Sequence, residues 1–390
     1  MSSHADTPPP APDAPPPAAP STTGPPADDP AVDATASQWQ LMARKFRKHK
    51  LAMIAAIVLL LLYLVAALAE FVAPYPLDRY DPEFTYAPPQ QLRLISDDGW
   101  QLRPFVYGLR TIRHPETMQR LYEEDRSQRH TLRLLVRGDT YRFWGLFETD
   151  LHLFGVDTPG RVHLLGTDSL GRDILSRIIY GARVSLTIGL IGVTLSFVLG
   201  LAIGAASGYY GGPIDNLIQR TIEIIQSFPT IPLWMAMGAA LPRDWSPLQI
   251  YFGITVVLSL VAWTGLAREV RGKLLALREE DFVMAARLAG ASPWRIMYRH
   301  LLPSFMSHIV VVLTLAIPGM ILAETALSFL GLGLQPPITS WGVLLQEAQN
   351  VQAVALNPWL LTPVFFVSLA VLAFNFVGDG LRDAADPYAR

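Results

Sequence analysis

Residues 51–69 (LAMIAAIVLLLLYLVAALA) form an uninterrupted apolar run without a single charged side chain. A helix that crosses the hydrocarbon core of a bilayer needs about 20 apolar residues. A buried helix of a soluble protein normally keeps one polar face, and this run has none. The run therefore predicts a transmembrane helix.

Five more apolar segments follow, and each is long enough to cross a bilayer as a helix. They lie at residues 184–206, 222–241, 250–267, 309–330 and 359–377. The segment at 222–241 is the least regular, because it is interrupted by Glu223, Gln226, Pro229 and Pro232. We therefore predict an all-α polytopic membrane protein with six transmembrane helices.

Composition excludes several classes of function. Hydrophobic residues make up 51% of the chain and charged residues 16%, against about 25% charged residues in soluble domains. The net charge is -2 and no basic stripe occurs, so no nucleic-acid partner is expected. The chain has no cysteine, which excludes disulfides, thiolate metal sites and cysteine catalysis.

The distribution of Lys and Arg predicts the orientation in the membrane. Basic residues cluster at 44–50, before the first span, and in the connector 268–304, whereas the connector 331–358 has none. Basic residues in short connectors mark the cytoplasmic side of the membrane. We therefore expect a multi-pass protein of the bacterial inner membrane, with both termini and the connector 268–304 in the cytoplasm.

The same features divide the chain into regions. Residues 1–40 are rich in Pro and Ala, and too poor in large apolar side chains to offset the entropy of ordering, so a disordered cytoplasmic tail is predicted. Residues 41–73 hold the first span and its basic flank. We assign 74–180 to an extracytoplasmic insertion with an interfacial helix, 181–380 to a core of five spans with a coupling loop at 268–304, and 381–390 to a cytoplasmic tail.

The insertion is expected to be a small α+β domain. Residues 132–137 and 141–144 alternate apolar and polar side chains, and Gly138-Asp139 between them suggests a hairpin turn. Two roles remain open. The insertion either receives a soluble binding protein or shields the mouth of a pore, or it is a scaffold without a ligand of its own.

The end of the insertion predicts a helix that runs to Tyr180. Thr167, Asp168 or Ser169 is expected to cap it, and Asp173 is expected to pair with Arg177 four residues later. A metal site at the two Asp residues is the weaker alternative, because acids at a helix start are more often caps. No metal or cofactor is expected.

Two features inside the predicted spans are candidate functional positions. Gly200, Gly204 and Gly208 recur every four residues, which predicts a groove where another helix packs closely. Glu324 is the one acid well inside a span. It is a candidate pathway or gating residue, with a structural hydrogen bond to a neighbouring helix as the alternative.

The connector 268–304 carries the clearest signal. Acids at 279–281 open a helix, Gly290 is its natural stop, and Ser292-Pro293 starts a second helix that Pro303 is expected to end. The first helix has a bare small-residue face, so the pair is interpreted as a docking element; packing only on its own chain is the alternative. The predicted docking residues are Asp281, Phe282, Ala285, Ala286, Arg287, Ala289, Gly290, Ala291 and Ser292.

This connector resembles the EAA loop of importer-type ABC permeases, through Ala285-Ala286-x-x-x-Gly290 and Leu302-Pro303. Met284 stands where that family usually has Glu. Three other motifs resemble the C-type permease subunit of dipeptide, oligopeptide and nickel importers: GTDxxGRD at 166–173, ExxLSFLGLG at 324–333 and GDGLRD at 378–383. The enlarged insertion is similar to the variant linked to microcin C-type and longer-peptide uptake.

The resemblance implies a larger assembly. Its other parts are a B-type permease subunit, cytoplasmic ABC ATPase subunits that receive the docking residues, and a periplasmic substrate-binding protein. The chain would be a non-catalytic subunit that forms half of an alternating-access pathway for peptides or peptide-like substrates, with nickel chelates as the alternative within the family. It has no Gly-x-x-x-x-Gly-Lys-Ser/Thr phosphate loop for ATP.

Two other classes of membrane protein, secondary transporters and intramembrane enzymes, fit the sequence less well. A secondary transporter usually shows inverted repeats and paired broken helices, and no convincing repeat is present. An intramembrane enzyme needs clustered polar residues inside the membrane, and the His residues are scattered.

Overall fold

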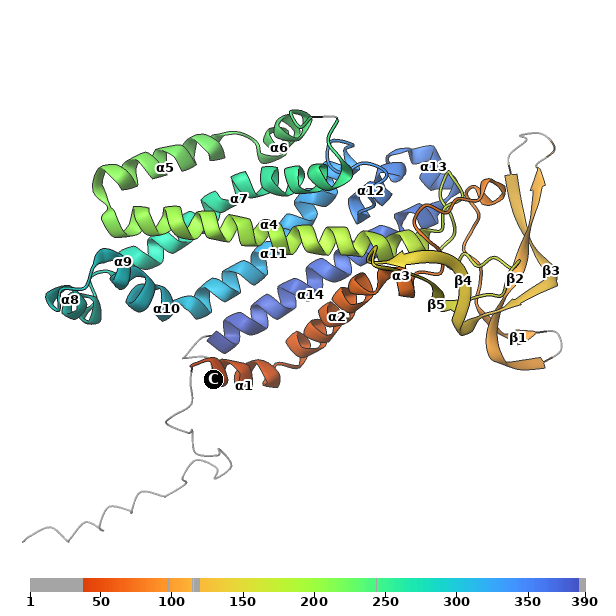
Figure 1. Ribbon diagram of the computed structural model, residues 1–390, viewed down its shortest axis with the longest axis horizontal. Helices are drawn as coiled ribbons and strands as arrows, with labels where there is room; N and C mark the ends of the chain where they lie inside the picture. The colour runs from red at the N-terminus through yellow and green to blue at the C-terminus, as the bar shows by residue number, and fades with distance from the viewer. Residues whose placement is uncertain (1–37, 97–98, 114, 116–119, 243, 386–390) are drawn as a thin grey trace, which may run out of the picture.

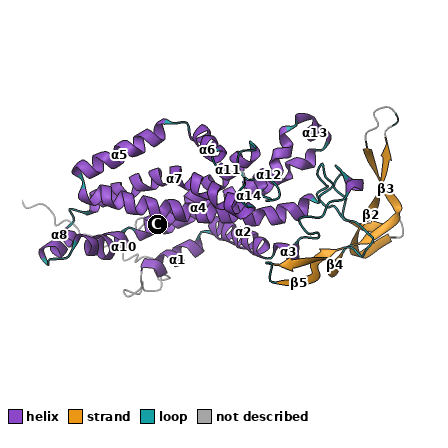
Figure 2. Cartoon of the chain, turned by 45° about the horizontal axis from the view of Figure 1, so that its top comes forward, coloured by secondary structure: helices purple, strands orange, loops and turns teal. Residues whose placement is uncertain are grey.

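The computed structural model describes residues 38–96, 99–113, 115, 120–242 and 244–385. Nearly all of the tail predicted at 1–40 lies outside these residues. The described part is an elongated helical bundle with its β-strands gathered at one end (Figures 1 and 2). We call this the sheet end, and we call the opposite end, where helices α8 to α10 lie, the hairpin end.

Within the described residues, five helices are long and apolar enough to cross a membrane. They are α2 (Lys50–Ala67), α4 (Ile174–Tyr210), α7 (Pro247–Leu277), α11 (Met306–Phe329) and α14 (Thr362–Ala385), the last preceded by the 3-10 turn η4 (Pro358–Leu361). α4 packs most extensively on α7, and α11 and α14 complete the bundle with α2. The predicted polytopic helical architecture is confirmed.

The predicted continuous span at 222–241 is not formed. The structure places two helices there, α5 (Gly212–Ser227) and α6 (Thr230–Ala239), which return from the hairpin end toward the sheet end (Figure 1). Phe228, between them, is extended, with φ −83° and ψ 139°. A residue before proline is disfavoured in the α conformation, and Pro229 has no N–H to continue the helix.

α4 and α7 run in the same direction. Gly200, Gly204 and Gly208 of α4 meet successively later parts of α7, at Leu266, Ala267 and Leu274 respectively. The chain between the two helices must therefore travel back along the bundle. The pair α5–α6 makes this return.

Shorter helices complete the two ends. At the hairpin end α1 (Gln38–Lys48) contains most of the basic flank and packs on α14. α14 itself continues to Ala385, so the predicted tail at 381–390 begins as helix. At the sheet end lie α3 (Ala69–Val72), η1 (Pro82–Phe84), α12 (Trp341–Gln346), η3 (Glu347–Gln349) and α13 (Val351–Leu356).

The strands lie between α3 and α4 in the chain. β1 (Arg93–Ser96), β2 (Gly99–Arg113) and β3 (Arg120–Thr131) form an antiparallel sheet in that order. β4 (Arg133–Phe143) and β5 (Phe147–Gly155) form a separate hairpin. The turn predicted at Gly138-Asp139 is wrong: that pair lies in a register shift within β4, and the chain reverses at residues 144–146, where Gly145 has φ 71°.

The start of α4 also differs from the prediction. Gly171, with φ 74°, turns the chain so closely past Asp81 that any Cβ would collide with its carbonyl oxygen. Asp173 then becomes the helix cap, accepting the N–H of Ser176 at 2.8 Å. Residues 174–180 are the first turns of α4 and not a separate interfacial helix.

The expected pair of Asp173 with Arg177 is wrong as well. Asp173 lies 3.1 Å from Nδ1 of His163, and Arg177 binds Asp168 instead. Asp168 also accepts a bond from Nε of Arg172 at 2.7 Å. The two acids are thus used to join the insertion to the start of α4.

Candidate docking and coupling site

Helix α8 (Asp281–Leu288) ends in a turn that Gly290 makes possible. The N–H of Gly290 donates to the Arg287 carbonyl at 3.0 Å, and the N–H of Ala291 donates to the Ala286 carbonyl at 3.0 Å. This pair of bonds is the Schellman arrangement, which needs a left-handed residue after the helix. Gly290 has φ 77°, so a side chain there is strained although nothing lies within 4 Å of its Cβ position.

The second helix starts as predicted but does not end as predicted. The Ser292 side chain accepts the N–H of Arg295 at 3.3 Å and so caps α9 (Pro293–Arg295). A π-helical turn, η2 (Ile296–Leu301), leads into α10 (Leu302–Ser304). Pro303 therefore lies within the helical path, because the wider turn before it relieves the clash of a proline ring with the carbonyl four residues earlier.

The inner side of this helical hairpin rests on the bundle. Val283, Ile296 and Leu301 are completely buried in one cluster with Val270 and Leu274 of α7. Among the predicted docking residues, Ala286 and Ala291 are half-buried against the same cluster. The hairpin is thus fixed to the ends of the long helices.

The outer side of α8 is exposed and largely apolar. Leu288 is 88% exposed, and Phe282 and Met284 are each 42% exposed. We define the docking face as Asp281, Phe282, Met284, Ala285, Leu288 and Ala289, all of which are exposed. Sequence reasoning missed Leu288, although its spacing from 281 and 285 places it on that face.

Arg287, by contrast, turns back toward its own chain. Its guanidinium lies 6.0 Å from the ring centre of Tyr209, near the end of α4. Gly290 and Ser292 lie in the exposed turn. Of the nine predicted docking residues, four therefore lie on the docking face, two in the turn, and three contact the supporting helices.

An ion pair ties α5 to α7 beside the hairpin. Nε and Nη2 of Arg271 each lie 2.6 Å from a carboxylate oxygen of Asp215. Ser207 of α4 donates a third bond to the same carboxylate. The Asp215 carboxylate therefore joins α4, α5 and α7.

The three spaced glycines form the contact between α4 and α7. A Cβ at Gly204 would lie 2.5 Å from the carbonyl oxygen of Ala267. At Gly200 and Gly208 it would lie 2.7 and 2.8 Å from side-chain carbons of Leu266 and Leu274. Real Cβ contacts are longer, so the two backbones approach closely only because these positions have no side chain.

Glu324 lies in a closed polar cluster and is 0% exposed. Its carboxylate accepts bonds from the hydroxyls of Ser340 at 2.6 Å, Ser328 at 2.8 Å and Ser185 at 3.3 Å. Ser340 directly precedes α12, Ser328 lies in α11 and Ser185 lies in α4. The structure therefore places Glu324 where three segments of the chain meet.

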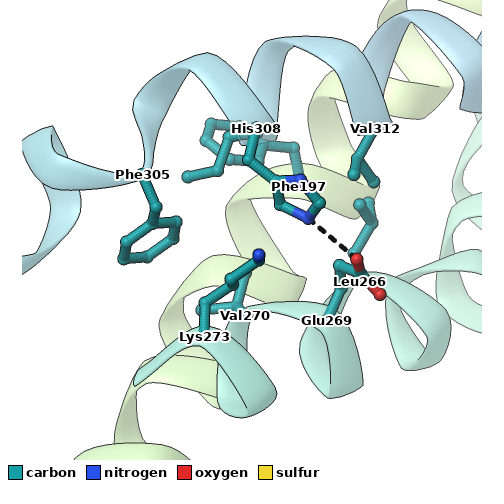
Figure 3. Close-up of a pocket in the computed structure, with 9 residues that line it drawn as sticks. Phe197, Leu266, Glu269, Val270, Lys273, Phe305, His308 and Val312 are labelled. Carbon is teal, nitrogen blue, oxygen red and sulfur yellow. Dashed lines mark hydrogen bonds and ion pairs between the residues drawn. The ribbon is translucent and has the colours of Figure 1, made fainter. Parts of the chain in front are cut away.

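A small, partly open pocket lies between α4, α7 and the start of α11 (Figure 3). Nε2 of His308 lies 2.8 Å from a carboxylate oxygen of Glu269, and Lys273 points into the same space. Val270 and Phe305 line this pocket and also belong to the cluster under the hairpin. Sequence analysis did not select this group, because its members are far apart in the chain.

The five long apolar helices define the class of protein: a polytopic α-helical membrane protein. Residues 197–390 match the family described as the binding-protein-dependent transport system inner membrane component. Residues 37–89 match the N-terminal TM domain of oligopeptide transport permease C. The chain therefore belongs to the family of permease subunits of ABC importers, which are the non-catalytic membrane components.

Curated relatives agree with this assignment. The chain is 40% identical over 238 residues to the dipeptide transport system permease protein of Bacillus subtilis, covering 60% of this chain and 71% of the relative. It is 42% identical to the oligopeptide transport system permease protein of Haemophilus influenzae, covering 58% and 71%. A dipeptide permease of Lactococcus lactis is 32% identical over 364 residues, or 92% of each chain. A secondary transporter or an intramembrane enzyme is not favoured.

Proposed function

We propose that this chain is a C-type permease subunit that, with a B-type permease subunit, forms the pathway for peptides or peptide-like substrates in an ABC importer. The named relatives are dipeptide and oligopeptide permeases, which supports this substrate class over nickel chelates. The second subunit would cover apolar side chains that α5 leaves exposed. Leu217 is 70% exposed and Ile224 is 63% exposed.

The docking face would seat in a cytoplasmic ABC ATPase. This proposal rests on a single observation: Leu288 and its neighbours form an exposed apolar face on a helix whose other side is anchored in the bundle. Large exposed apolar groups at the end of a rigid element are typical of a protein contact. Movement of an ATPase would then reach α4 and α7 through the buried residues Val283 and Ile296.

The proposed topology has six crossings, with α5 and α6 together as the third. The shared direction of α4 and α7 supports this, since the chain must cross back between them. Both termini and the hairpin end would be cytoplasmic. The insertion at 74–180 would be periplasmic, where a substrate-binding protein delivers its ligand.

The experiment that tests docking uses Leu288→Asp. The side chain is 88% exposed, so the change leaves the fold intact, but it places a charge in the proposed contact. Losing the burial of one Leu costs about 1.5–3 kcal/mol, which is roughly a 10- to 150-fold loss in association. We expect the ATPase to be lost in pull-downs at matched membrane levels, together with substrate-stimulated ATP hydrolysis.

Two further variants sharpen this test. Gly290→Leu should also release the ATPase, because it strains the left-handed turn that orients α8. Leu134→Asp in β4 is the matched control, since Leu134 is also largely exposed (76%) but lies at the sheet end. Full retention of the ATPase by Leu288→Asp and Gly290→Leu would refute the docking proposal.

A further inference from the structure

The turn between β4 and β5 presents an unusual set of exposed side chains. Leu146 is 78% exposed, Phe147 is 56% exposed and Trp144 is 54% exposed. Trp144 and Gly145 both have positive φ, at 48° and 71°. The tight turn therefore projects three large apolar groups from the tip of a two-stranded hairpin. We call residues 143–147 the apolar tip.

A hydrogen bond fixes the height of this tip along the bundle. Nε1 of Trp144 donates to the carbonyl oxygen of Ala67 at 2.9 Å. Ala67 is the last residue of α2, which has 18 residues. At 1.5 Å per residue α2 is about 27 Å long, close to the thickness of the hydrocarbon core. The apolar tip therefore lies level with the boundary between hydrocarbon and lipid headgroups.

Charged groups hold the tip in this place. The Arg183 guanidinium lies over the Trp144 ring, and its central carbon is 4.3 Å from the centre of that ring. Arg183 forms a bidentate ion pair with Glu70, with both N–O distances 2.6 Å, and donates to the Ala66 carbonyl at 2.9 Å. Burial alone would raise the pKa of Glu70, but the hydrogen bonds from Arg183 lower it by more. The pKa of Glu70 therefore lies below its ordinary value. The pair thus remains charged and keeps the tip beside α2.

The surroundings of the tip match an interface between lipid and water. The neighbouring face of α2 is exposed and apolar. Leu60 is 67% exposed and Leu64 is 51% exposed, and their spacing places both on the same side of the helix as Ala67. Directly behind the tip, Arg142 and Glu148 form an exposed cross-strand ion pair at 3.5 Å. Aromatic side chains with charged groups on the aqueous side are typical of membrane interfaces.

We infer that the apolar tip is a membrane anchor. Leu146 and Phe147 insert into the lipid leaflet at the sheet end, Trp144 lies at headgroup level, and the Arg142–Glu148 pair stays in water. The partner of this surface is the phospholipid bilayer itself. The anchor holds the β4–β5 hairpin against the membrane, and this inference does not depend on the transported substrate.

The test uses the absence of cysteine from the chain. Single variants Leu146→Cys, Leu60→Cys and Ser127→Cys are labelled with a nitroxide and placed in phospholipid nanodiscs as the full-length protein with its partner subunits. Leu60 is the lipid-facing reference, and Ser127, exposed in β3, is the aqueous reference. Collisions of each label with oxygen, which concentrates in lipid, and with a water-soluble nickel chelate are then compared.

We expect the label at 146 to resemble the label at 60, with more collisions with oxygen than with the nickel chelate. Adding Trp144→Ala, which removes the bond to Ala67, should shift the label at 146 toward aqueous behaviour. A label at 146 that behaves like the label at 127 would overturn the inference. Protection from both reagents would also overturn it, because the tip would then contact protein and not lipid.

Discussion

Glu324 organises its surroundings through three serines that each make two hydrogen bonds. The hydroxyls of Ser185, Ser328 and Ser340 donate to the carboxylate and accept the backbone N–H groups of Trp341, Leu334 and Val343. The carboxylate thus orients three hydroxyls that in turn fix the chain around α12. Burial without solvent makes every one of these bonds expensive to lose.

The first prediction compares Glu324→Ala with Glu324→Gln. Alanine leaves three hydroxyls without their acceptor, at about 1–3 kcal/mol for each unsatisfied group. Glutamine keeps an oxygen for Ser328 and Ser340 and offers its N–H to Ser185. We expect the alanine variant to melt several degrees lower in detergent, and the glutamine variant to stay near the parent. Equal melting temperatures for the two variants would contradict a structural role, and a stable glutamine variant without uptake would favour the pathway role.

The second prediction concerns the Asp215–Arg271 pair. Two hydrogen bonds from Arg271 and one from Ser207 end on the Asp215 carboxylate. Asp215→Ala and Arg271→Ala should each lower the melting temperature in detergent. The double variant should lose less than the sum of the two single losses, because residues in one hydrogen-bond network are not additive. Additive losses would show that the pair does not hold α5 to α7.

At the scale of elements, the contact of α4 with α7 depends on missing side chains. Gly204→Ala would push a methyl group toward the Ala267 carbonyl, and we expect it to destabilise the protein by about 1–3 kcal/mol. Gly272→Ala in α7 is the matched control, because nothing lies within 4 Å of its Cβ position. The control should be neutral or stabilising by up to about 1 kcal/mol, since alanine favours helix. Thermal denaturation of both variants checks the third prediction; similar losses would show that the effect is one of propensity alone.

Sequence predicted elements well where the signal was local. Gly290 and Ser292-Pro293 determine the turn of the helical hairpin through local backbone preferences, and the long apolar runs predicted the long helices. Prediction from the sequence failed where residues that are far apart in the chain determine the local structure. The turn at Trp144-Gly145 depends on how β4 pairs with β5, and the choice of Asp173 as cap depends on the close approach of Asp81 to Gly171. Pro229 marks the break between α5 and α6 locally, but hydropathy continues across it because both helices contain apolar residues.

At the scale of the whole molecule, topology is the fourth prediction. Six crossings place the N- and C-termini on one side of the membrane, whereas five would place them on opposite sides. Reporters fused before Met1 and after Arg390 should both be cytoplasmic. An impermeant maleimide should label Ser127→Cys in intact spheroplasts, and Ser292→Cys only after permeabilisation. Termini on opposite sides would show that α5 and α6 do not cross.

The candidate sites were also predictable only where their residues are close together in the chain. Four of the residues predicted for docking lie on the exposed face of α8, since helix periodicity can be counted along the chain. The clusters that join distant segments, such as His308 with Glu269, have no such period. They become visible only when α7 and α11 are packed together.

One consequence follows from the length of α4, which runs unbroken from Ile174 to Tyr210. At 1.5 Å per residue its 37 residues extend for about 56 Å. Its first turn is bound to the insertion through Asp173 and His163, and Tyr209 near its last turn supports Arg287 of the hairpin. A stiff rod of this length acts as a lever: a tilt of about 5° at one end moves the other by about 5 Å. Movements at the sheet end and at the hairpin end are therefore mechanically joined within a single helix.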